Sequence, residues 1–351
     1  MTLAERKSAF VELGKFLGQF SQDGSLQKEG VRKNESFFDS FTELIKLSQS
    51  HNRWFTQDQV YFAIRSWSEA LTQENLNKWL EPYDLNNAEP KTIGLVLAGN
   101  IPLVGFHDFL SVLITGHKAL VKTSSNDQQL LPFLAKYLMA VEPQFEGSIT
   151  FTDKKLENFD AVIATGSNNT ARYFEYYFKD KPSIIRKNRN SVAVLTGNET
   201  PKELIALGED ILRYFGLGCR NVSKLFVPKG YDFTNFWQAI YEYKDIIHYE
   251  RYANNYDYNK AVYLMSNFKL LDNGFLTLKE DSSYSSPISS VFYEYYDTLE
   301  ELEQKLKADS DLLQCVVSKN INKSIAFGKT QKPELWDYAD NVDTIEFLSK
   351  I

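Results

Sequence analysis

The chain has 351 residues, of which 43% are hydrophobic and 24% charged, as in ordinary globular proteins with room for two domains. Its net charge of −7 argues against a nucleic-acid-binding surface, so an anionic ligand would need a local basic patch. Two cysteines, Cys219 and Cys315, are too few for a disulfide scaffold.

The N-terminus carries no visible secretion signal, because MTLAERKSAF is charged early and has no apolar core. The most apolar stretch, residues 109–121, is interrupted by polar side chains and is too short to span a bilayer. We therefore expect a cytoplasmic protein without a membrane span, in which both thiols stay reduced.

The first ninety residues are predicted to be helical. Apolar side chains recur at helical spacing around Phe10 and Phe41, and residues 54–79 continue the helical pattern. From Lys91 to Phe178, short apolar strands alternate with helices, which indicates a parallel, doubly wound sheet. The expected strands are TIGLVLAG, KALVK, SITFTD and DAVIATG. The expected helices are FHDFLSVLITG, SSNDQQLLPFLAKYLMAV, which opens with capping residues, and NNTARYFEYYF.

A second α/β region follows the first. Its expected strands are SVAVLTG, VSKLFVP, SSVFYEYY and LQCVVS. Helices are expected from Pro201 to about Phe215, around residues 233–243, and over TLEELEQKLKA. The segments between the second of these helices and SSVFYEYY are mixed in character.

Several common catalytic signatures are missing from the sequence. No G-x-G-x-x-G fingerprint follows a strand, and there is no P-loop, H-E-x-x-H motif or G-x-S-x-G elbow. The histidines show no metal-ligand spacing, so no metal site is predicted, and a Cys-His hydrolase is disfavoured. They are His51, His107, His117 and His248.

Cys219 is the strongest candidate for a reactive residue. It lies in FGLGCRNVSKLFVP, where Gly216 and Gly218 form a flexible turn between a helix and a strand. Such a turn can expose a thiol and direct backbone N–H groups at a bound oxygen, and Arg220 could favour the thiolate. The alternative is a small buried residue that packs against the strand.

Four segments, in this order, resemble the aldehyde dehydrogenase superfamily, and GLGCRNVSKL points to its LuxC-type acyl-CoA reductases. LVLAGNIPLVGFHDFLSVLITGHKALVKTSS resembles the strand, Asn-x-Pro turn, helix, and strand ending in a cofactor-binding Lys. ATGSNNTARYF resembles the Gly-Ser turn that opens a helix. FGLGCRNVSKLFVP resembles the segment around the catalytic Cys, and SSPISSVFYEYY resembles a late Phe-Gly-Pro segment. The resemblance runs from about Thr92 to the C-terminus. It implies an α/β fold with a parallel-sheet cofactor-binding domain and an α/β catalytic domain, beside the helical N-terminal region.

The resemblance assigns catalytic roles to two residues. Cys219 would attack the thioester carbonyl and form an acyl-enzyme. Asn100 would donate its side-chain amide to the developing oxyanion. A simple turn Asn before Pro102 is the alternative for Asn100.

The resemblance also implies a cofactor site. Lys122 would donate to the adenosine ribose, with a strand-end surface lysine as the alternative. Gly166 and Ser167 would bind the pyrophosphate at a helix N-terminus, where Ser167 could also be an ordinary cap. Ser124 and Ser125 occupy the segment where NAD-preferring relatives often carry a carboxylate, and they favour the 2′-phosphate of NADPH.

Two positions depart from the family pattern. The general-base Glu of hydrolytic members falls near Arg186, where no acid is present. The later cofactor-contacting Glu falls near Ser283, and Glu280 and Asp281 are the nearest acids. The basic run over residues 186–189 could meet phosphates of CoA or NADP, with a solvated loop as the alternative.

We predict three parts of the chain: a helical region with the NADP-binding domain (1–190), a catalytic domain carrying the nucleophilic Cys (191–318), and a C-terminal segment near the domain interface (319–351). The predicted function is reduction of a fatty acyl-CoA to aldehyde by NADPH through an acyl-Cys thioester. NAD(P)-dependent aldehyde oxidation stays open, as does a non-reducing acyl-binding protein, acyltransferase or thioesterase. The expected partner is acyl-CoA or another acyl thioester, and the sequence leaves oligomerisation open.

Overall fold

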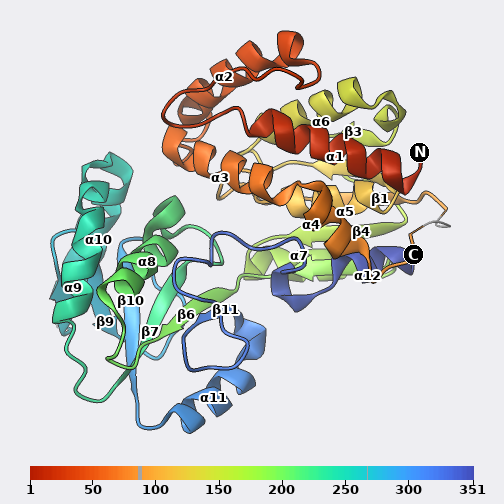
Figure 1. Ribbon diagram of the computed structural model, residues 1–351. Coiled ribbons are helices and arrows are strands. Elements are labelled where there is room, and N and C mark those ends of the chain that lie inside the picture. Colours follow the sequence, from red (N-terminus) through yellow and green to blue (C-terminus); the bar gives the residue numbers. More distant parts are fainter. Residues whose placement is uncertain (86–88, 267) are drawn as a thin grey trace. The chain divides into compact units, whose positions relative to one another are not determined.

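The structure, a computed structural model, describes residues 1–85, 89–266 and 268–351. The chain divides into two compact units (Figure 1). Unit 1 comprises Met1–Lys187 and Glu334–Ile351, and unit 2 comprises Asn188–Pro333. The functions assigned above to three parts of the chain stay predictions.

Four helices precede the first strand of unit 1. They are α1 (Leu3–Leu17), α2 (Asn34–His51), α3 (Gln57–Ala70) and α4 (Gln73–Leu80). The side chains of Thr2, Thr56 and Thr72 each accept a hydrogen bond from the backbone N–H three residues later, and so cap α1, α3 and α4. The predicted helical N-terminal region is confirmed.

One parallel sheet, in the order β3-β2-β1-β4-β5, forms the centre of unit 1. Its strands are β1 (Thr92–Val96), β2 (Lys118–Lys122), β3 (Ile149–Phe151), β4 (Ala161–Thr165) and β5 (Ser183–Arg186). The predicted parallel α/β arrangement is confirmed. The prediction missed β5, because this strand has four residues and ends in a buried cation that no apolar pattern reveals.

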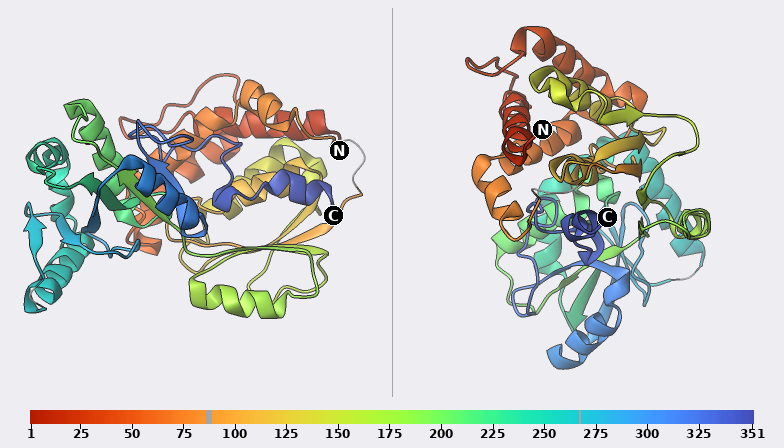
Figure 2. Two further views of the ribbon diagram at one scale, coloured as in Figure 1. Left: turned by 90° about the horizontal axis from the view of Figure 1, so that it is seen from below. Right: turned by 90° about the vertical axis from the view of Figure 1, so that its right-hand side faces the viewer.

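Helices cover both faces of this sheet. They are α5 (Phe106–Ile114), α6 (Leu130–Val141), α7 (Asn168–Tyr177) and α12 (Thr344–Ser349), with short 3-10 turns at Pro143–Phe145 and Ala339–Asn341. Figure 2 shows α7 on one face of the sheet and α1, α5 and α6 on the other. Gly116 follows α5 with a φ of 93°, a left-handed conformation that ends a helix easily.

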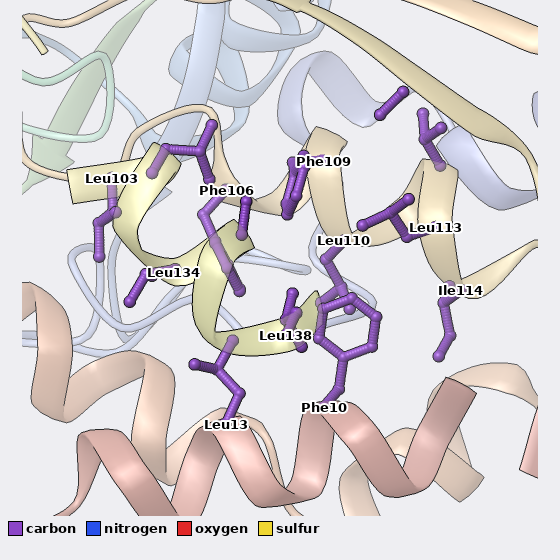
Figure 3. Close-up of a cluster of buried hydrophobic side chains, with 14 of the residues drawn as sticks. Phe10, Leu13, Leu103, Phe106, Phe109, Leu110, Leu113, Ile114, Leu134 and Leu138 are labelled. Atoms are coloured by element: carbon purple, nitrogen blue, oxygen red, sulfur yellow. The ribbon is translucent and has the colours of Figure 1, made fainter. Parts of the chain in front are cut away.

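The main core of unit 1 lies where α1, α5 and α6 meet (Figure 3). Apolar positions on the three helices face one another, and burial of each large side chain contributes roughly 1.5–3 kcal/mol. The residues in this layer are fully buried: Phe10, Leu13, Phe106, Phe109, Leu110, Leu134 and Leu138. This packing holds the loops at the ends of the strands on a rigid base.

Two of the four histidines have structural contacts within unit 1. Nε2 of His107 lies 2.9 Å from the carbonyl oxygen of Leu335, and Nε2 of His117 lies 3.0 Å from that of Leu348. Burial lowers the pKa of His117. Both imidazoles therefore tie the C-terminal segment of the chain to the region of α5.

Unit 2 contains a six-stranded sheet in the order β11-β6-β7-β10-β9-β8. Its strands are β6 (Asn190–Val194), β7 (Val222–Pro228), β8 (Leu270–Asp272), β9 (Thr277–Glu280), β10 (Ser290–Tyr296) and β11 (Leu313–Val317). The β8–β9 pair is antiparallel, and the other pairs are parallel. The sequence predicted four of these strands and left β8 and β9 unassigned, in the mixed segments.

The helices of unit 2 are α8 (Pro201–Leu212), α9 (Thr234–Ile240), α10 (Glu250–Met265) and α11 (Leu299–Ala308). Shorter 3-10 segments lie at Arg213–Gly216, Tyr241–His248 and Ser310–Leu312. Thr200 and Glu203 form a capping box at the start of α8, and Pro201 occupies its first turn. This helix leads directly to the turn that carries Cys219.

Arg186, at the end of β5, belongs to a buried ion pair. Its guanidinium lies 2.8 Å from Oδ1 of Asp108 on α5, and the two side chains are 5% and 10% exposed. It also donates to the carbonyl oxygen of Ala339 and to Oγ1 of Thr344. Both interpretations offered for the basic run are therefore wrong for Arg186, which is a structural residue joining β5, α5 and the C-terminal segment.

We expect Arg186→Ala to destabilise unit 1 strongly, because it leaves the Asp108 carboxylate buried without its main counter-charge. Breaking one side of a buried pair typically costs about 3–5 kcal/mol. Chemical denaturation monitored by circular dichroism would measure this loss.

The neighbouring residue supplies a matched control. Lys187 pairs with Glu175 at 2.6 Å, but both side chains are about half exposed. Lys187→Ala should change the free energy of unfolding by less than about 1 kcal/mol, as exposed pairs usually do. Equal effects of the two substitutions would contradict the role given to Arg186.

Candidate active site

Asn100 lies in the loop between β1 and α5. The loop begins with a continuation of strand pairing, since the Leu97 N–H donates to the carbonyl oxygen of Lys122 at 3.0 Å. Further along, Leu103 takes a left-handed φ of 57° and donates its N–H to Oδ2 of Asp127 at 3.3 Å. The loop that carries Asn100 is therefore fixed at both ends.

Lys122, Ser124 and Ser125 follow one another at the end of β2. Nζ of Lys122 donates to the carbonyl oxygen of Lys154 at 3.1 Å, which leaves two of its three N–H donors for another acceptor. A Cβ at Gly99 would lie 2.8 Å from Cβ of Ser124, so glycine permits the close approach of the two loops. Ser125 is exposed.

Gly166 and Ser167 connect β4 with α7. Oγ of Ser167 accepts a hydrogen bond from the N–H of Thr170 at 3.3 Å and caps the helix. A Cβ at Gly166 would lie 2.9 Å from Thr170 and 3.0 Å from Phe174, which explains why glycine stands there. The predicted cap is confirmed, and the pyrophosphate role stays a prediction.

These three segments share one edge of the sheet in unit 1. Val96 of β1 is paired with Lys122 of β2, and β1 is also paired in parallel with β4. The carboxyl ends of the three strands therefore lie together. From β1 the chain moves outward to β2 and β3, and from β4 it moves outward to β5, so β1 and β4 flank a topological switch point. Ligands of open α/β sheets bind at such points.

A carboxylate lies near this edge but faces inward. Oδ1 and Oδ2 of Asp127 accept hydrogen bonds from the N–H groups of Leu130 and Leu103. Burial raises the pKa of the Asp127 carboxyl to about 6. Asp127 belongs to the segment SSND, which the sequence predicts to cap the following helix, and its bond to the N–H of Leu130 agrees with that prediction.

Cys219 lies in unit 2, in the turn between α8 and β7, and its side chain is exposed. The approach to the turn is unusual, because Tyr214, Phe215 and Gly216 have φ values of 54°, 58° and 77°. Two of these residues carry side chains that normally disfavour a left-handed backbone. The exposed position is the one that a nucleophile requires.

The second thiol has a different environment. Cys315, on β11, is 4% exposed, and Nη1 of Arg220 lies 3.3 Å from its Sγ. This guanidinium nitrogen contacts Cys315, and an electrostatic effect of Arg220 on the Cys219 thiol stays a prediction. A buried thiol beside a cation is held in place and is not presented to a substrate.

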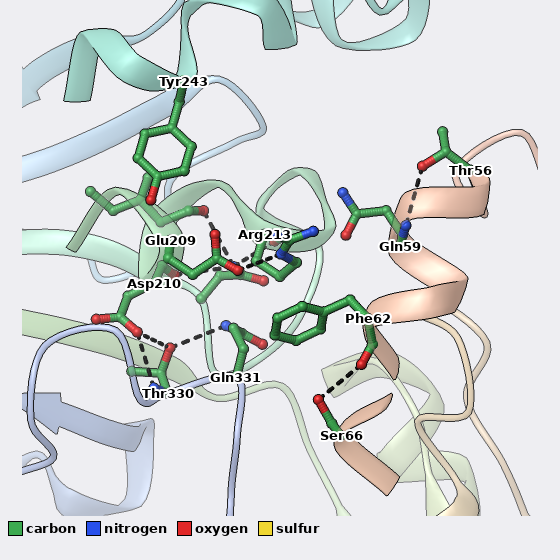
Figure 4. Close-up of polar contacts among 12 residues, drawn as sticks. Thr56, Gln59, Phe62, Ser66, Glu209, Asp210, Arg213, Tyr243, Thr330 and Gln331 are labelled. Carbon is green, nitrogen blue, oxygen red and sulfur yellow. Dashed lines mark hydrogen bonds and ion pairs between the residues drawn. The ribbon is translucent and has the colours of Figure 1, made fainter. Parts of the chain in front are cut away.

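The base of the Cys219 turn is anchored at the end of α8 (Figure 4). Asp210 accepts hydrogen bonds from the N–H groups of Gly328 and Thr330 at 2.7 and 3.0 Å, and from Oγ1 of Thr330 at 2.8 Å. Burial raises the pKa of this carboxyl to about 6. The adjacent Glu209 pairs with Arg213 at 2.5 Å.

A small pocket opens beside the same turn. It is bordered by the turn itself at Gly216 and Asn221 and by the loop that precedes β10. Most of its remaining lining is apolar and includes Ile211, Leu212, Phe215, Tyr252, Leu276 and Ile288. Cys219 does not line this pocket, and its volume of about 20 Å³ is too small for an acyl chain.

The acids near Ser283 are engaged locally. Oδ2 of Asp281 lies 2.5 Å from Nζ of Lys279, and Oδ1 accepts from the N–H of Ser283 at 2.8 Å. Burial alone would raise the pKa of Asp281, but the Lys279 contact and the N–H bond hold it below its usual value. Glu280 is exposed.

No helix in the described ranges is both long and apolar enough to cross a membrane. Within residues 1–85, 89–266 and 268–351, no three His, Cys, Asp or Glu side chains are grouped so that they could hold a metal ion.

Comparison with known proteins identifies the family. The profile described as Acyl-CoA reductase (LuxC) matches residues 36–245. This chain belongs to the LuxC acyl-CoA reductase family. A curated relative, the long-chain acyl-protein thioester reductase of Aliivibrio fischeri, is 25% identical over 175 residues, which are 43% of this chain and 35% of the relative. The chain spans about a third of the length of this curated relative.

Solved aldehyde dehydrogenases share the fold. Aldehyde dehydrogenase 21 of Physcomitrella patens, in complex with succinate, has a TM-score of 0.68 and 12% identity, over 100% of this chain and 84% of that one. The NAD+ complex of the Bacillus cereus aldehyde dehydrogenase has a TM-score of 0.62 and 14% identity, over 92% and 73%. The predicted aldehyde-dehydrogenase-like fold is confirmed.

We expect iodoacetamide to modify Cys219 of the native LuxC-family protein at least about tenfold faster than Cys315, because buried thiols are poorly accessible and inert. Peptide mass spectrometry over a time course would give both rates. In urea the two thiols should react alike, which controls for intrinsic reactivity. Equal rates in the native protein would contradict the exposure difference.

Proposed function

We propose that this protein reduces an acyl thioester, with fatty acyl-CoA as the preferred substrate, to the aldehyde at the expense of NADPH. The observation that carries the proposal is the exposed thiol of Cys219 on a fixed turn, within the segment that matches the LuxC family. The reductase activity named for the Aliivibrio fischeri relative supports it.

Cys219 is the proposed nucleophile. Its thiolate attacks the thioester carbonyl carbon, and the tetrahedral species expels CoA as a thiolate that then takes up a proton. The acyl group remains on Sγ as a new thioester. After reduction, the thiohemiacetal on Sγ loses the proton of its hydroxyl, the C–S bond breaks, and aldehyde and the Cys219 thiolate are released.

Asn100 is proposed as the donor to the developing oxyanion. An amide N–H held ready at that position stabilises negative charge that appears only as the carbonyl is attacked, and such a donor is worth about 3 kcal/mol. The support is its position in the loop after β1, which Asp127 and the Leu97–Lys122 bond hold in place.

The residues at the carboxyl edge of the sheet in unit 1 fit a phosphorylated dinucleotide. Bound there, reduced nicotinamide supplies the hydride for the chemistry. Lys122 would donate to the adenosine ribose, and Gly166 and Ser167 would present the N-terminus of α7 to the pyrophosphate. Ser124 and Ser125 would donate to a 2′-phosphate, and the nearest acid, Asp127, is already occupied by backbone N–H groups.

Aldehyde oxidation by NAD(P)+ is the second candidate, because the solved neighbours are aldehyde dehydrogenases. Hydrolysis of an acyl-enzyme needs a general base. Three acids between β6 and the Cys219 turn are engaged locally: Glu199 accepts from Thr196, Glu203 pairs with Lys319, and Glu209 pairs with Arg213. This favours the reductase. We further propose a cytoplasmic location and leave the number of subunits open.

The proposed function predicts that acyl-CoA, given without cofactor, acylates Cys219. Peptide mass spectrometry should find the adduct on that residue, and NADPH should then release it as aldehyde. Cys219→Ala should lose at least about 10³-fold in turnover, as expected when a nucleophile is removed. Cys315→Ala is the matched control and should keep both activities. An acyl adduct on Cys315 alone, or an active Cys219→Ala protein, would refute the assignment.

We expect NADPH to give a higher kcat/KM than NADH, by about tenfold or more, which corresponds to one added charge-assisted contact of about 1.5–3 kcal/mol. Substituting Ser125→Glu should reverse the preference, because a carboxylate repels the 2′-phosphate and accepts ribose hydroxyls. Steady-state kinetics with both cofactors would measure it. Equal kcat/KM values in the unmodified protein would contradict the cofactor assignment.

A further inference from the structure

Asn221 closes the turn that carries Cys219. Its side chain is almost fully buried, at 3% exposure, and its Oδ1 accepts the N–H of Gly218 at 2.8 Å. The backbone repeats this link in the opposite sense, because the N–H of Asn221 donates to the carbonyl oxygen of Gly218 at 3.0 Å. The segment from 218 to 221 is therefore locked into one small loop with Cys219 inside it.

The other end of the same amide holds the loop to α8. Nδ2 of Asn221 lies 3.1 Å from the carbonyl oxygen of Asp210, 3.3 Å from that of Ile211 and 2.8 Å from that of Arg213. Carbonyl groups at the end of a helix have no N–H donor within the helix, and the side-chain amide of Asn221 provides donors for them. The orientation of the amide is unambiguous, since Oδ1 faces a donor and Nδ2 faces acceptors.

A second anchor acts on the peptide of Cys219 itself. Oγ of Ser191, a fully buried residue at the start of β6, donates to the carbonyl oxygen of Cys219 at 2.9 Å. Arg220 is held in turn through its contact with Cys315. The chain is thus fixed immediately before, at and after the residue with the exposed thiol.

We infer that Asn221 is a positioning residue, which sets the direction of the Cys219 thiol through the Gly218 peptide and thereby the rate of acyl transfer. It touches no reacting atom in this role. The inference rests on the proposed function of Cys219 as the nucleophile. The loop has only two residues, Cys219 and Arg220, between the residues that close it. A rotated Gly218 peptide therefore displaces Sγ, and a displacement of about 1 Å can cost about 10²-fold in rate.

The test measures single-turnover acylation of Cys219 by acyl-CoA without cofactor, with Asn221→Ala compared with the unmodified protein. The saturating acylation rate should fall about 10–100-fold, while the half-saturating acyl-CoA concentration changes less than about threefold, because orientation is lost and binding is not. Alkylation of Cys219 by iodoacetamide, which requires no fixed orientation, should change less than about threefold.

Tyr243→Phe is the matched control. The hydroxyl of Tyr243 donates to the carbonyl oxygen of Ile205 at 2.9 Å, so this change also removes a hydrogen bond to α8, but away from the turn. It should leave the acylation rate within about twofold of the unmodified protein, as loss of a remote contact normally does. Thermal unfolding of each variant would confirm that the compared proteins are folded.

Ser191→Ala serves as a second variant if Asn221→Ala does not fold. It removes only the hydroxyl that holds the Cys219 carbonyl, and the saturating acylation rate should fall about 3–10-fold at an unchanged half-saturating concentration. The inference is overturned if the variants acylate at the normal rate, if Tyr243→Phe loses as much rate, or if only the half-saturating concentration rises. Failure of the unmodified protein to acylate would refute the proposed function, and the inference with it.

Discussion

Parallel pairing of β1 with both β2 and β4 is the constraint on which the candidate cofactor edge depends. Because the three strands run in the same direction, their carboxyl ends meet, and segments that are separated in the sequence become neighbours. The helices α5 and α6 must then cross back over the sheet to start the next strand. Their burial against α1 fixes the crossings, so the core of unit 1 and the position of Asn100, Lys122 and Ser167 have one cause.

The turn in unit 2 depends on contacts that offset backbone strain. Two side-chain-bearing residues, Tyr214 and Phe215, adopt a left-handed backbone that typically costs about 1–3 kcal/mol each. Such strain persists only where the surroundings determine the conformation. Phe215 stacks on Tyr249 with ring centroids 4.6 Å apart, and the Asn221 amide bonds the carbonyl of Arg213 at the start of this run.

How much the sequence predicts varies with the kind of signal. Short apolar runs predicted β2 and β7 to the residue, because apolar residues in both strands are buried and the runs end at polar or breaking residues. The four-residue strand β5 escaped prediction, since its last residue is the buried Arg186. Its pairing with Asp108 joins residues that are 78 positions apart, and no local pattern contains that information.

The site residues also divide into those that a local sequence pattern locates and those that depend on contacts with other segments. Asn100, Lys122 and Ser167 are at strand ends, where a family resemblance and a sheet topology agree on their location. Asn221 was overlooked, because its importance comes from hydrogen bonds to backbone groups of another segment. Arg220 also makes a contact that no local sequence pattern reveals. Adjacent residues in a turn diverge, and its guanidinium reaches Cys315 on β11.

A thiol that carries an acyl group between two half-reactions needs a fixed backbone and an open approach at the same time. Burial would give the first and remove the second, as it does for Cys315. The turn at Cys219 meets both requirements. The buried side chains of Asn221 and Ser191 bond the N–H of Gly218 and the carbonyl oxygen of Cys219, while the side chain of Cys219 stays exposed. Backbone hydrogen bonds therefore provide the rigidity that packing would otherwise have to supply. This arrangement fixes the backbone around Cys219 while leaving its side chain exposed.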